Sequence, residues 1–86
     1  MSQKKIVVYT QTICPYCDRA KALLKNKGLE FEEINLDGKD DERKALVEKT
    51  GMRTVPQIFI GDHFVGGSQE LSAFEATGEL DRLLNS

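Results

Sequence analysis

Two cysteines separated by two residues are the side chains of this sequence best suited to chemistry. They stand in the segment Cys14-Pro15-Tyr16-Cys17, directly after the β-branched and aromatic run Ile6 to Thr10, which predicts a buried strand. Pro15 suits the first turn of a helix and Gly28 suits its end, so the pattern predicts a helix from Pro15 to about Lys27. The pair therefore falls where a strand ends and a helix begins, and its spacing lets the two thiols close a small disulfide ring.

The predicted helix would act directly on the sulfur of Cys14. This residue falls at the N-cap, where a side chain accepts hydrogen bonds from the second and third helical amides, here those of Tyr16 and Cys17. The helix N-terminus adds partial positive charge, and Arg19 and Lys21 follow within the next turns. Because all of these favour the anion, we expect the pKa of Cys14 to fall below the reference value of about 8.5, which makes it a nucleophile toward disulfides. Cys17 lies on the apolar stripe of the helix and should be more buried.

Three other roles are compatible with the same pair: a structural disulfide, half of a zinc site, or two inert buried cysteines. A ring this small would stabilise the fold little. Zinc prefers four ligands, and the only further ligand of its usual type is His63, far along the chain, which we interpret as a surface residue of a hairpin. A C-x-x-C motif beside a β-α-β pattern is instead typical of thioredoxin-like redox sites.

The rest of the pattern predicts the elements that hold this segment in place. Residues 11–13 read as a loop, and Gly61-Asp62 as a two-residue hairpin turn with glycine first. Ser68 is expected to cap the third helix, whose Leu71 and Phe74 face inward. The further strands are predicted at 31–36, 57–60 and 63–65, the second helix at 39–50, and a last helical turn around 80–84. The order β-α-β-α-β-β-α predicts an α/β fold, in which a four-stranded mixed sheet is flanked by helices.

Length and composition limit the classes of protein to which the chain can belong. Its 86 residues predict one domain spanning 1–86, and 40% apolar with 30% charged residues is typical of a globular protein. A net charge of −2 argues against a nucleic-acid binder. The longest apolar run, Ile6 to Tyr9, is too short to span a membrane, and we expect a monomer in the cytoplasm.

Two segments far from the cysteines invite a functional interpretation. Pro56 opens a predicted strand, and it is either an ordinary edge-strand proline or a cis proline; a cis bond would leave the backbone of Val55 free to pair with an extended peptide. Gly66-Gly67-Ser68 reads as a tight turn into a helix N-terminus, which either offers free amides to a carboxylate or is a plain glycine turn.

Taken together, these motifs resemble those of a glutaredoxin over essentially the whole chain. The resemblance rests on Cys14-Pro15-Tyr16-Cys17 after a strand, on Arg53-Thr54-Val55-Pro56, and on Gly66-Gly67 before the last helix. Thioredoxin proper is less similar, because its site reads Trp-Cys-Gly-Pro-Cys and this chain has no tryptophan. The monothiol branch is also less similar, since its motif ends in serine where Cys17 stands.

The resemblance implies a thioredoxin-like fold and a dithiol oxidoreductase with glutathione as co-substrate and no metal. Cys14 would attack and Cys17 would resolve, and the substrates would be glutathionylated or disulfide-containing proteins. It also implies a cis bond before Pro56, pairing of Val55 with the glutathione backbone, and carboxylate contacts at Ser68 and Arg43. The implied glutathione site consists of Gln11, Tyr16, Arg43, Thr54, Val55, Pro56, Gly67, Ser68 and Gln69.

Two positions depart from the family pattern, and two other functions remain open. Gln11 and Gln69 stand where the family usually carries Lys and Asp, and each loses a charge that would pair with glutathione, so binding is expected to be weaker than is typical. One alternative is a thioredoxin-like reductase supplied by a flavoprotein. The other is an iron–sulfur carrier in which two chains each give Cys14, although Pro15 stiffens the loop that a shared cluster must fit.

Overall fold

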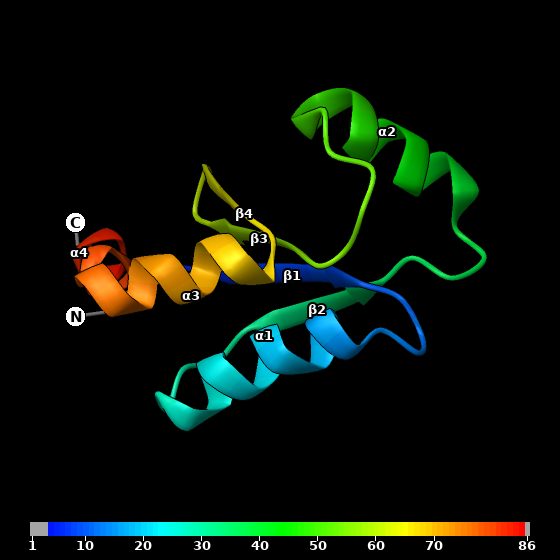
Figure 1. Ribbon diagram of the computed structural model, residues 1–86. Helices are drawn as coiled ribbons and strands as arrows, with labels where there is room; N and C mark the ends of the chain where they lie inside the picture. The colour runs from blue at the N-terminus through cyan, green and yellow to red at the C-terminus, as the bar shows by residue number, and fades with distance from the viewer. Residues whose placement is uncertain (1–3, 86) are drawn as a thin grey trace.

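Burial alternates along Ile6–Thr10, which forms the strand β1, and β1 is one of the two central strands of the sheet. The computed structural model describes residues 4–85. Ile6, Val8 and Thr10 point to one face and are buried, while Val7 and Tyr9 point to the other and are half-buried. The elements that follow are α1 (Pro15–Asn26), β2 (Glu32–Asn35), α2 (Asp40–Thr50), β3 (Gln57–Ile60), β4 (His63–Gly66), α3 (Ser68–Thr77) and α4 (Glu79–Leu84), drawn in Figure 1.

The four strands form one mixed sheet in the order β2-β1-β3-β4. β1 pairs with β2 in parallel and with β3 antiparallel, so that Tyr9 lies opposite Gln57. β3 and β4 form the predicted hairpin, in which Ile60 pairs with His63 across a turn whose Gly61 has a φ of +58°. The predicted β-α-β-α-β-β-α order is confirmed, and the last helical turn is the short helix α4.

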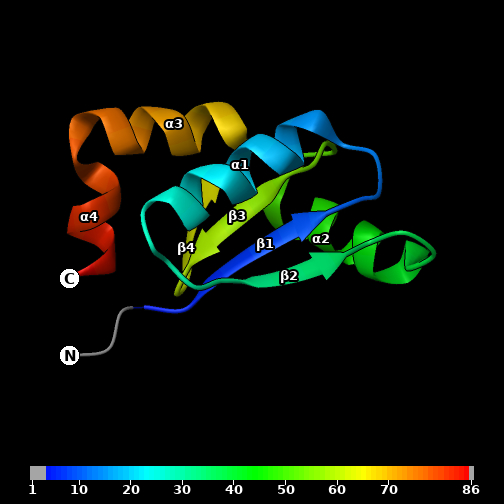
Figure 2. The same cartoon turned by 90° about the horizontal axis from the view of Figure 1, so that it is seen from below.

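Helices cover both faces of this sheet, as expected from the sequence. α1 and α3 lie side by side over one face, and α2 lies on the other (Figure 2). The larger apolar core lies under α1, α3 and α4 and includes Leu24, Ile58 and Leu71. α2 contributes a single buried side chain, Leu46, which agrees with its thin apolar stripe.

Salt bridges join the ends of three helices far from the cysteines. Lys27 Nζ, at the C-cap of α1, lies 2.9 Å from Glu75 Oε1 and 3.2 Å from Asp81 Oδ1. The hydrogen bond with Glu75 is the main reason that the pKa of Lys27 is raised. Within residues 4–85, no helix is both long and apolar enough to cross a bilayer.

One capping prediction is wrong. The N-cap of α3 is Gly67, and Ser68 is the first residue inside the helix. The reason is local: Glu70, three residues after Gly67, accepts a hydrogen bond from the Gly67 amide through Oε1 at 2.8 Å. This contact closes the first turn around Gly67 and leaves the Ser68 side chain without a capping role.

Other boundaries differ by one or two residues. The second strand begins at Glu32, because Phe31 falls out of phase and packs against the larger core instead. The strand ends at Asn35, although the amide of Leu36 still donates to Thr10 O at 2.9 Å. The fourth strand continues to Gly66, which pairs with Ile58. Such shifts at element ends are expected where propensity alone sets the boundary.

Candidate active site

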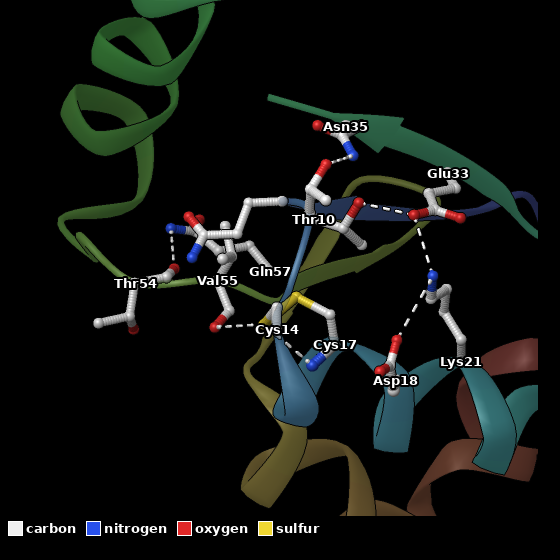
Figure 3. The surroundings of a disulfide bond; sticks show 12 residues. Thr10, Cys14, Cys17, Asp18, Lys21, Glu33, Asn35, Thr54, Val55 and Gln57 are labelled. Carbon is white, nitrogen blue, oxygen red and sulfur yellow. Dashed lines mark hydrogen bonds and ion pairs between the residues drawn. A yellow bond between two sulfur atoms is a disulfide. The ribbon is translucent and has the colours of Figure 1, made fainter. Parts of the chain in front are cut away.

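Cys14 and Cys17 lie at the first turn of α1 and are joined by a disulfide, with their Cα atoms 5.1 Å apart (Figure 3). Cys14 is the N-cap, with extended backbone, and its Sγ accepts a hydrogen bond from the Cys17 amide at 3.1 Å. The predicted N-cap position is therefore confirmed. Of the two predicted donors, the amides of Tyr16 and Cys17, the Cys17 amide makes the bond. Cys17 is 1% exposed and Cys14 is 8% exposed. The buried position predicted for Cys17 is also confirmed.

The carbonyl oxygen of Val55 lies opposite Cys14 and would act against the anion. It is 3.8 Å from Cys14 Sγ, and the bond between Val55 and Pro56 is cis. Once the disulfide is open, a thiol could donate to this oxygen, whereas a thiolate would face it as a second acceptor. The capping amide is closer, and it is supported by the helix dipole. The amide and the dipole should therefore prevail, and the arrangement favours the thiolate.

A cavity of about 370 Å³ lies next to the turn that Cys14 caps. Cys14 is not part of its lining, but Tyr16 and Val55, which lie on either side of Cys14, are. The cavity is bordered by the first turn of α1, the loop before β3 and the first turn of α3. The predicted positions that line it are Tyr16, Thr54, Val55, Pro56, Gly67, Ser68 and Gln69. A hollow of about 640 Å³ beside Lys5 and Phe31 is larger, but it lies away from the cysteines. The smaller cavity includes Val55, whose carbonyl oxygen lies 3.8 Å from Cys14 Sγ, so it is the candidate for the chemistry.

Two predicted positions lie outside that lining and contact one another. Arg43 Nη2, on α2, donates to Gln11 Oε1 at 3.3 Å. Gln11 follows β1 directly, so this contact fixes the Arg43 guanidinium near the end of that strand. The side-chain oxygen of Gln11 is therefore already engaged by Arg43.

Two residues of the cavity wall were missed by sequence reasoning. Met52, which reads as loop or core filler, lines the cavity, and its Cε would lie 3.1 Å from a Cβ built on Gly67. Glu70 also lines the cavity. Its spacing from Gly67 is the signal that could have revealed it, because a carboxylate at the third helical position caps the turn. No comparable signal exists for Met52.

The loop that carries Val55 is held from below by a buried glutamine. Gln57, 1% exposed, donates through Nε2 to Met52 O at 2.7 Å and to Thr54 O at 3.0 Å. Its Oε1 lies 2.9 Å from the hydroxyl of Thr50, which donates to it. These bonds fix both ends of the segment that faces Cys14.

Replacing Gln57 with leucine should therefore destabilise the protein. The change leaves the carbonyl groups of Met52 and Thr54 without their buried donor, at an expected cost of about 2–3 kcal/mol in the free energy of unfolding. Urea denaturation measures this directly. The matched control, Gln69→Leu at an exposed glutamine, should change stability by less than about 0.5 kcal/mol. Equal effects of the two substitutions would contradict the role given to Gln57.

A second polar network joins α1 to the sheet one turn beyond Cys17. The buried hydroxyl of Thr10 donates to Glu33 Oε2 at 2.7 Å, and Lys21 Nζ lies 3.1 Å from the same oxygen (Figure 3). The hydrogen bond from Thr10, aided by Lys21, holds the pKa of Glu33 below its usual range. Within residues 4–85, Thr10 and Gln57 are the buried polar side chains, and both belong to the half of the sheet nearest Cys14.

The residue before Cys14 has an unusual backbone conformation. Ile13 has a φ of +55°, in the left-handed region, and its side chain is 90% exposed. This conformation costs an L-residue about 1–2 kcal/mol, and β-branched residues adopt it rarely. Tyr16, on the other side of Cys14, is 54% exposed, and the Arg19 guanidinium lies 5.2 Å from its ring centroid.

His63 lies at the opposite end of the sheet from Cys14. It pairs with Ile60, which in turn pairs with Ile6 at the start of β1, whereas Cys14 follows the end of β1. Its interpretation as an exposed hairpin residue is confirmed. Over residues 4–85, no group of three or more His, Cys, Asp or Glu side chains is placed to hold a metal ion.

These features define a class of protein. A redox-active cysteine pair starts a helix directly after a central strand, faces the loop of a cis proline, and lies in a mixed sheet covered by helices on both faces. That combination is the thioredoxin-like fold of a thiol-disulfide oxidoreductase.

Comparison with known proteins then identifies the family. The glutaredoxin family model matches residues 6–65. A glutaredoxin of Pseudomonas aeruginosa is 52% identical over 81 residues, which cover 94% of this chain and 96% of that protein. Glutaredoxin 3 of Escherichia coli K12 is 47% identical over 79 residues, covering 92% and 95%. The chain belongs to the glutaredoxin family.

Solved structures agree with this assignment. The buckwheat glutaredoxin–glutathione complex superimposes with a TM-score of 0.90 at 35% identity, covering 95% of this chain and 77% of that one. The glutaredoxin of Brucella melitensis gives a TM-score of 0.87 at 48% identity, covering 98% and 91%. The thioredoxin-like fold expected from the sequence is therefore confirmed.

Proposed function

We propose that this protein uses glutathione to reduce protein–glutathione mixed disulfides and protein disulfides through Cys14 and Cys17. The observation that carries the proposal is the cavity beside Cys14, which combines the backbone of Val55, directly before the cis Pro56, with the amino end of α3. Glutathione has an extended backbone and a carboxylate at each end, so these two features match it. The buckwheat relative, 35% identical, was solved as a glutathione complex, which supports the same ligand here.

The proposal assigns each part of glutathione a partner in this arrangement. The amide of Val55 has no hydrogen-bond acceptor among residues 4–85, so it is available to the cysteinyl backbone. The first amides of α3, at Ser68 and Gln69, can receive the γ-glutamyl carboxylate, and Thr54 and Pro56 form the wall opposite them. Tyr16 would flank the peptide. Arg43, oriented by Gln11, would meet the glycyl carboxylate.

The monothiol cycle needs only Cys14 and two glutathione sulfurs. The Cys14 thiolate forms a bond to the glutathionyl sulfur of the substrate, the substrate disulfide breaks, and the protein thiolate leaves with the electron pair and takes a proton from water. A second glutathione thiolate then attacks the sulfur attached to Cys14. Glutathione disulfide forms, and Cys14 returns to the thiolate that the Cys17 amide stabilises.

Protein disulfides require the second cysteine. Cys14 attacks one substrate sulfur, and Cys17 then attacks Cys14 to release the reduced substrate and leave the Cys14–Cys17 disulfide. Two glutathione molecules reduce that disulfide and leave as glutathione disulfide. Such a cycle depends on a continuous supply of reduced glutathione, so we also propose that the protein works in the cytoplasm.

The source of electrons tests this proposal. The mixed disulfide of glutathione and 2-mercaptoethanol serves as substrate, with NADPH consumption followed under two supplies: glutathione with glutathione reductase, and thioredoxin reductase alone. Turnover with the glutathione system and none with thioredoxin reductase is the expected result. The opposite pattern would favour a flavoprotein-fed reductase and overturn glutathione dependence.

Restoring one family charge should strengthen glutathione recognition. Gln69 lies at the second position of α3 and is exposed, so Gln69→Asp adds a carboxylate near the expected γ-glutamyl ammonium. In this exposed setting the gain is about two- to fivefold in KM for the glutathionylated substrate. Steady-state kinetics measures it, with the uncharged Gln69→Asn as the control. Gln11→Lys is a less clean test, because it removes the oxygen that Arg43 contacts and adds a like charge beside it. If Gln69→Asp and Gln69→Asn have the same KM, Gln69 does not face glutathione.

A further inference from the structure

Two large apolar side chains are exposed within residues 4–85, and both border the reacting sulfur. Ile13 precedes Cys14 and is 90% exposed, while Tyr16 follows it and is 54% exposed. Single exposed apolar residues are common on protein surfaces and need no explanation. Here one of the two precedes Cys14 and the other follows it by two residues, so their position matters more than their number.

The backbone of Ile13 makes its presence costly to the isolated protein. At a φ of +55° glycine or asparagine would be accommodated more readily than a β-branched residue. The side chain buries almost no surface, so no packing within the described chain compensates for this cost. An apolar group that stays exposed at this cost points to contact with another molecule.

In a mixed disulfide bound at this site, the glutathionyl half would lie in the cavity beside Cys14, and the polypeptide half would lie outside it. Tyr16 lines this cavity, but Ile13 does not. A glutathionyl group held there need not touch Ile13. During displacement the attacking, central and leaving sulfurs lie close to one line, so the leaving sulfur of the substrate lies on the far side of the glutathionyl sulfur from Cys14. The polypeptide attached to it lies outside the cavity, where Ile13 is the exposed apolar residue next to Cys14 that the glutathionyl group leaves free.

We propose that Ile13 is a specificity-determining residue for protein substrates, which packs against an apolar side chain next to the glutathionylated cysteine of the substrate. The inference rests on the proposed function, which places the glutathionyl half in the cavity. The partner that packs against Ile13 is the polypeptide half of the same mixed disulfide. The bond changes are those of the monothiol cycle: Cys14 gains the glutathionyl sulfur, and the substrate cysteine leaves as its thiolate.

A matched pair of variants isolates the apolar contribution. Ile13→Val and Ile13→Thr both keep the β-branch and so share the same backbone cost, and they differ by one methyl group against one hydroxyl. The substrates are two glutathionylated peptides that are identical except for leucine or serine beside the modified cysteine. Pre-reduced protein is mixed with each peptide in a single turnover without added thiol, which removes glutathione recycling from the measurement.

Wild type and Ile13→Val are expected to react about fivefold faster with the leucine peptide, and Ile13→Thr should lose most of that preference, since burial of apolar surface drives it. On the mixed disulfide of glutathione and 2-mercaptoethanol, which has no neighbouring side chain, the three proteins should agree within about twofold. Equal preferences in the Val and Thr variants, or a slowing of Ile13→Thr on every substrate alike, would overturn the inference alone. If wild type reduces protein disulfides but reacts with none of the glutathionylated compounds, the proposed function itself is overturned.

Discussion

The Cys14→Ser variant will show no measurable turnover of either substrate class. A serine hydroxyl at this N-cap stays protonated at neutral pH and cannot form a disulfide, so the expected loss is at least about a thousandfold in kcat/KM. The NADPH-coupled assay with glutathione reductase measures it for mixed disulfides, and insulin reduction measures it for protein disulfides.

The fold should survive this change. Serine is a strong N-cap residue. Its Oγ can accept the hydrogen bond from the Cys17 amide that Cys14 Sγ accepts in the wild type. The melting temperature of the variant is therefore expected to match that of the reduced wild type. Residual activity above about one per cent in a correctly folded Cys14→Ser protein would show that another group begins the reaction.

The ionisation of Cys14 can be read in a protein that lacks the second thiol. In Cys17→Ser, the rate of alkylation by iodoacetamide should reach half its maximum well below about pH 8.5, the reference for free cysteine. The capping amide at 3.1 Å and the helix dipole are the physical reasons. A midpoint at or above the reference value would mean that the Val55 carbonyl outweighs them.

The second large effect separates the two activities. Cys17→Ser should keep the reduction of glutathionylated substrates within about threefold, because that cycle uses Cys14 alone, and should lose about a hundredfold on protein disulfides. The reason is proximity: Cys17 lies in the same helical turn as Cys14 and attacks without diffusion, whereas free glutathione must find the mixed disulfide.

The hydroxyl that Cys17→Ser introduces lies at a buried position, so folding needs its own control. Cys17→Ala removes the sulfur without adding a buried hydroxyl and should give the same split between the two activities. Equal losses on both substrate classes in both variants would contradict the assignment of Cys17 as the resolving thiol.

The sequence predicts those parts of the site that local rules control. The N-cap at Cys14 follows from Pro15 and the end of the preceding strand, and the buried position of Cys17 follows from the helical stripe. The hairpin at Gly61 is likewise local, because two residues between strands require a positive φ at the first. Each of these signals lies within a few residues of the feature that it specifies.

Four features were not predicted in this way, some because they depend on distant contacts and others because a local contact or conformation runs against the usual preference. Composition alone cannot choose a cis bond before Pro56; only the family resemblance indicated it. The N-cap at Gly67 depends on a side chain three residues later, which outweighs the intrinsic preference for serine. The contact between Arg43 and Gln11 joins α2 to the end of β1, and the left-handed conformation of Ile13 runs against its propensity, so neither leaves a pattern in the sequence.

The buried hydroxyl of Thr10 and the buried amide of Gln57 lie at the end of the sheet nearest Cys14, whereas the buried side chains that α4 contributes at the other end, Leu80 and Leu84, are aliphatic. Directional bonds therefore set the geometry around the sulfurs, while non-directional packing beneath α4 supplies cohesion. The geometry of the thiols and the stability of the fold therefore depend on different parts of the protein. Aliphatic substitutions beneath α4 should be able to raise heat resistance without retuning the thiols, which makes that end the natural place to adapt this protein to a hotter environment.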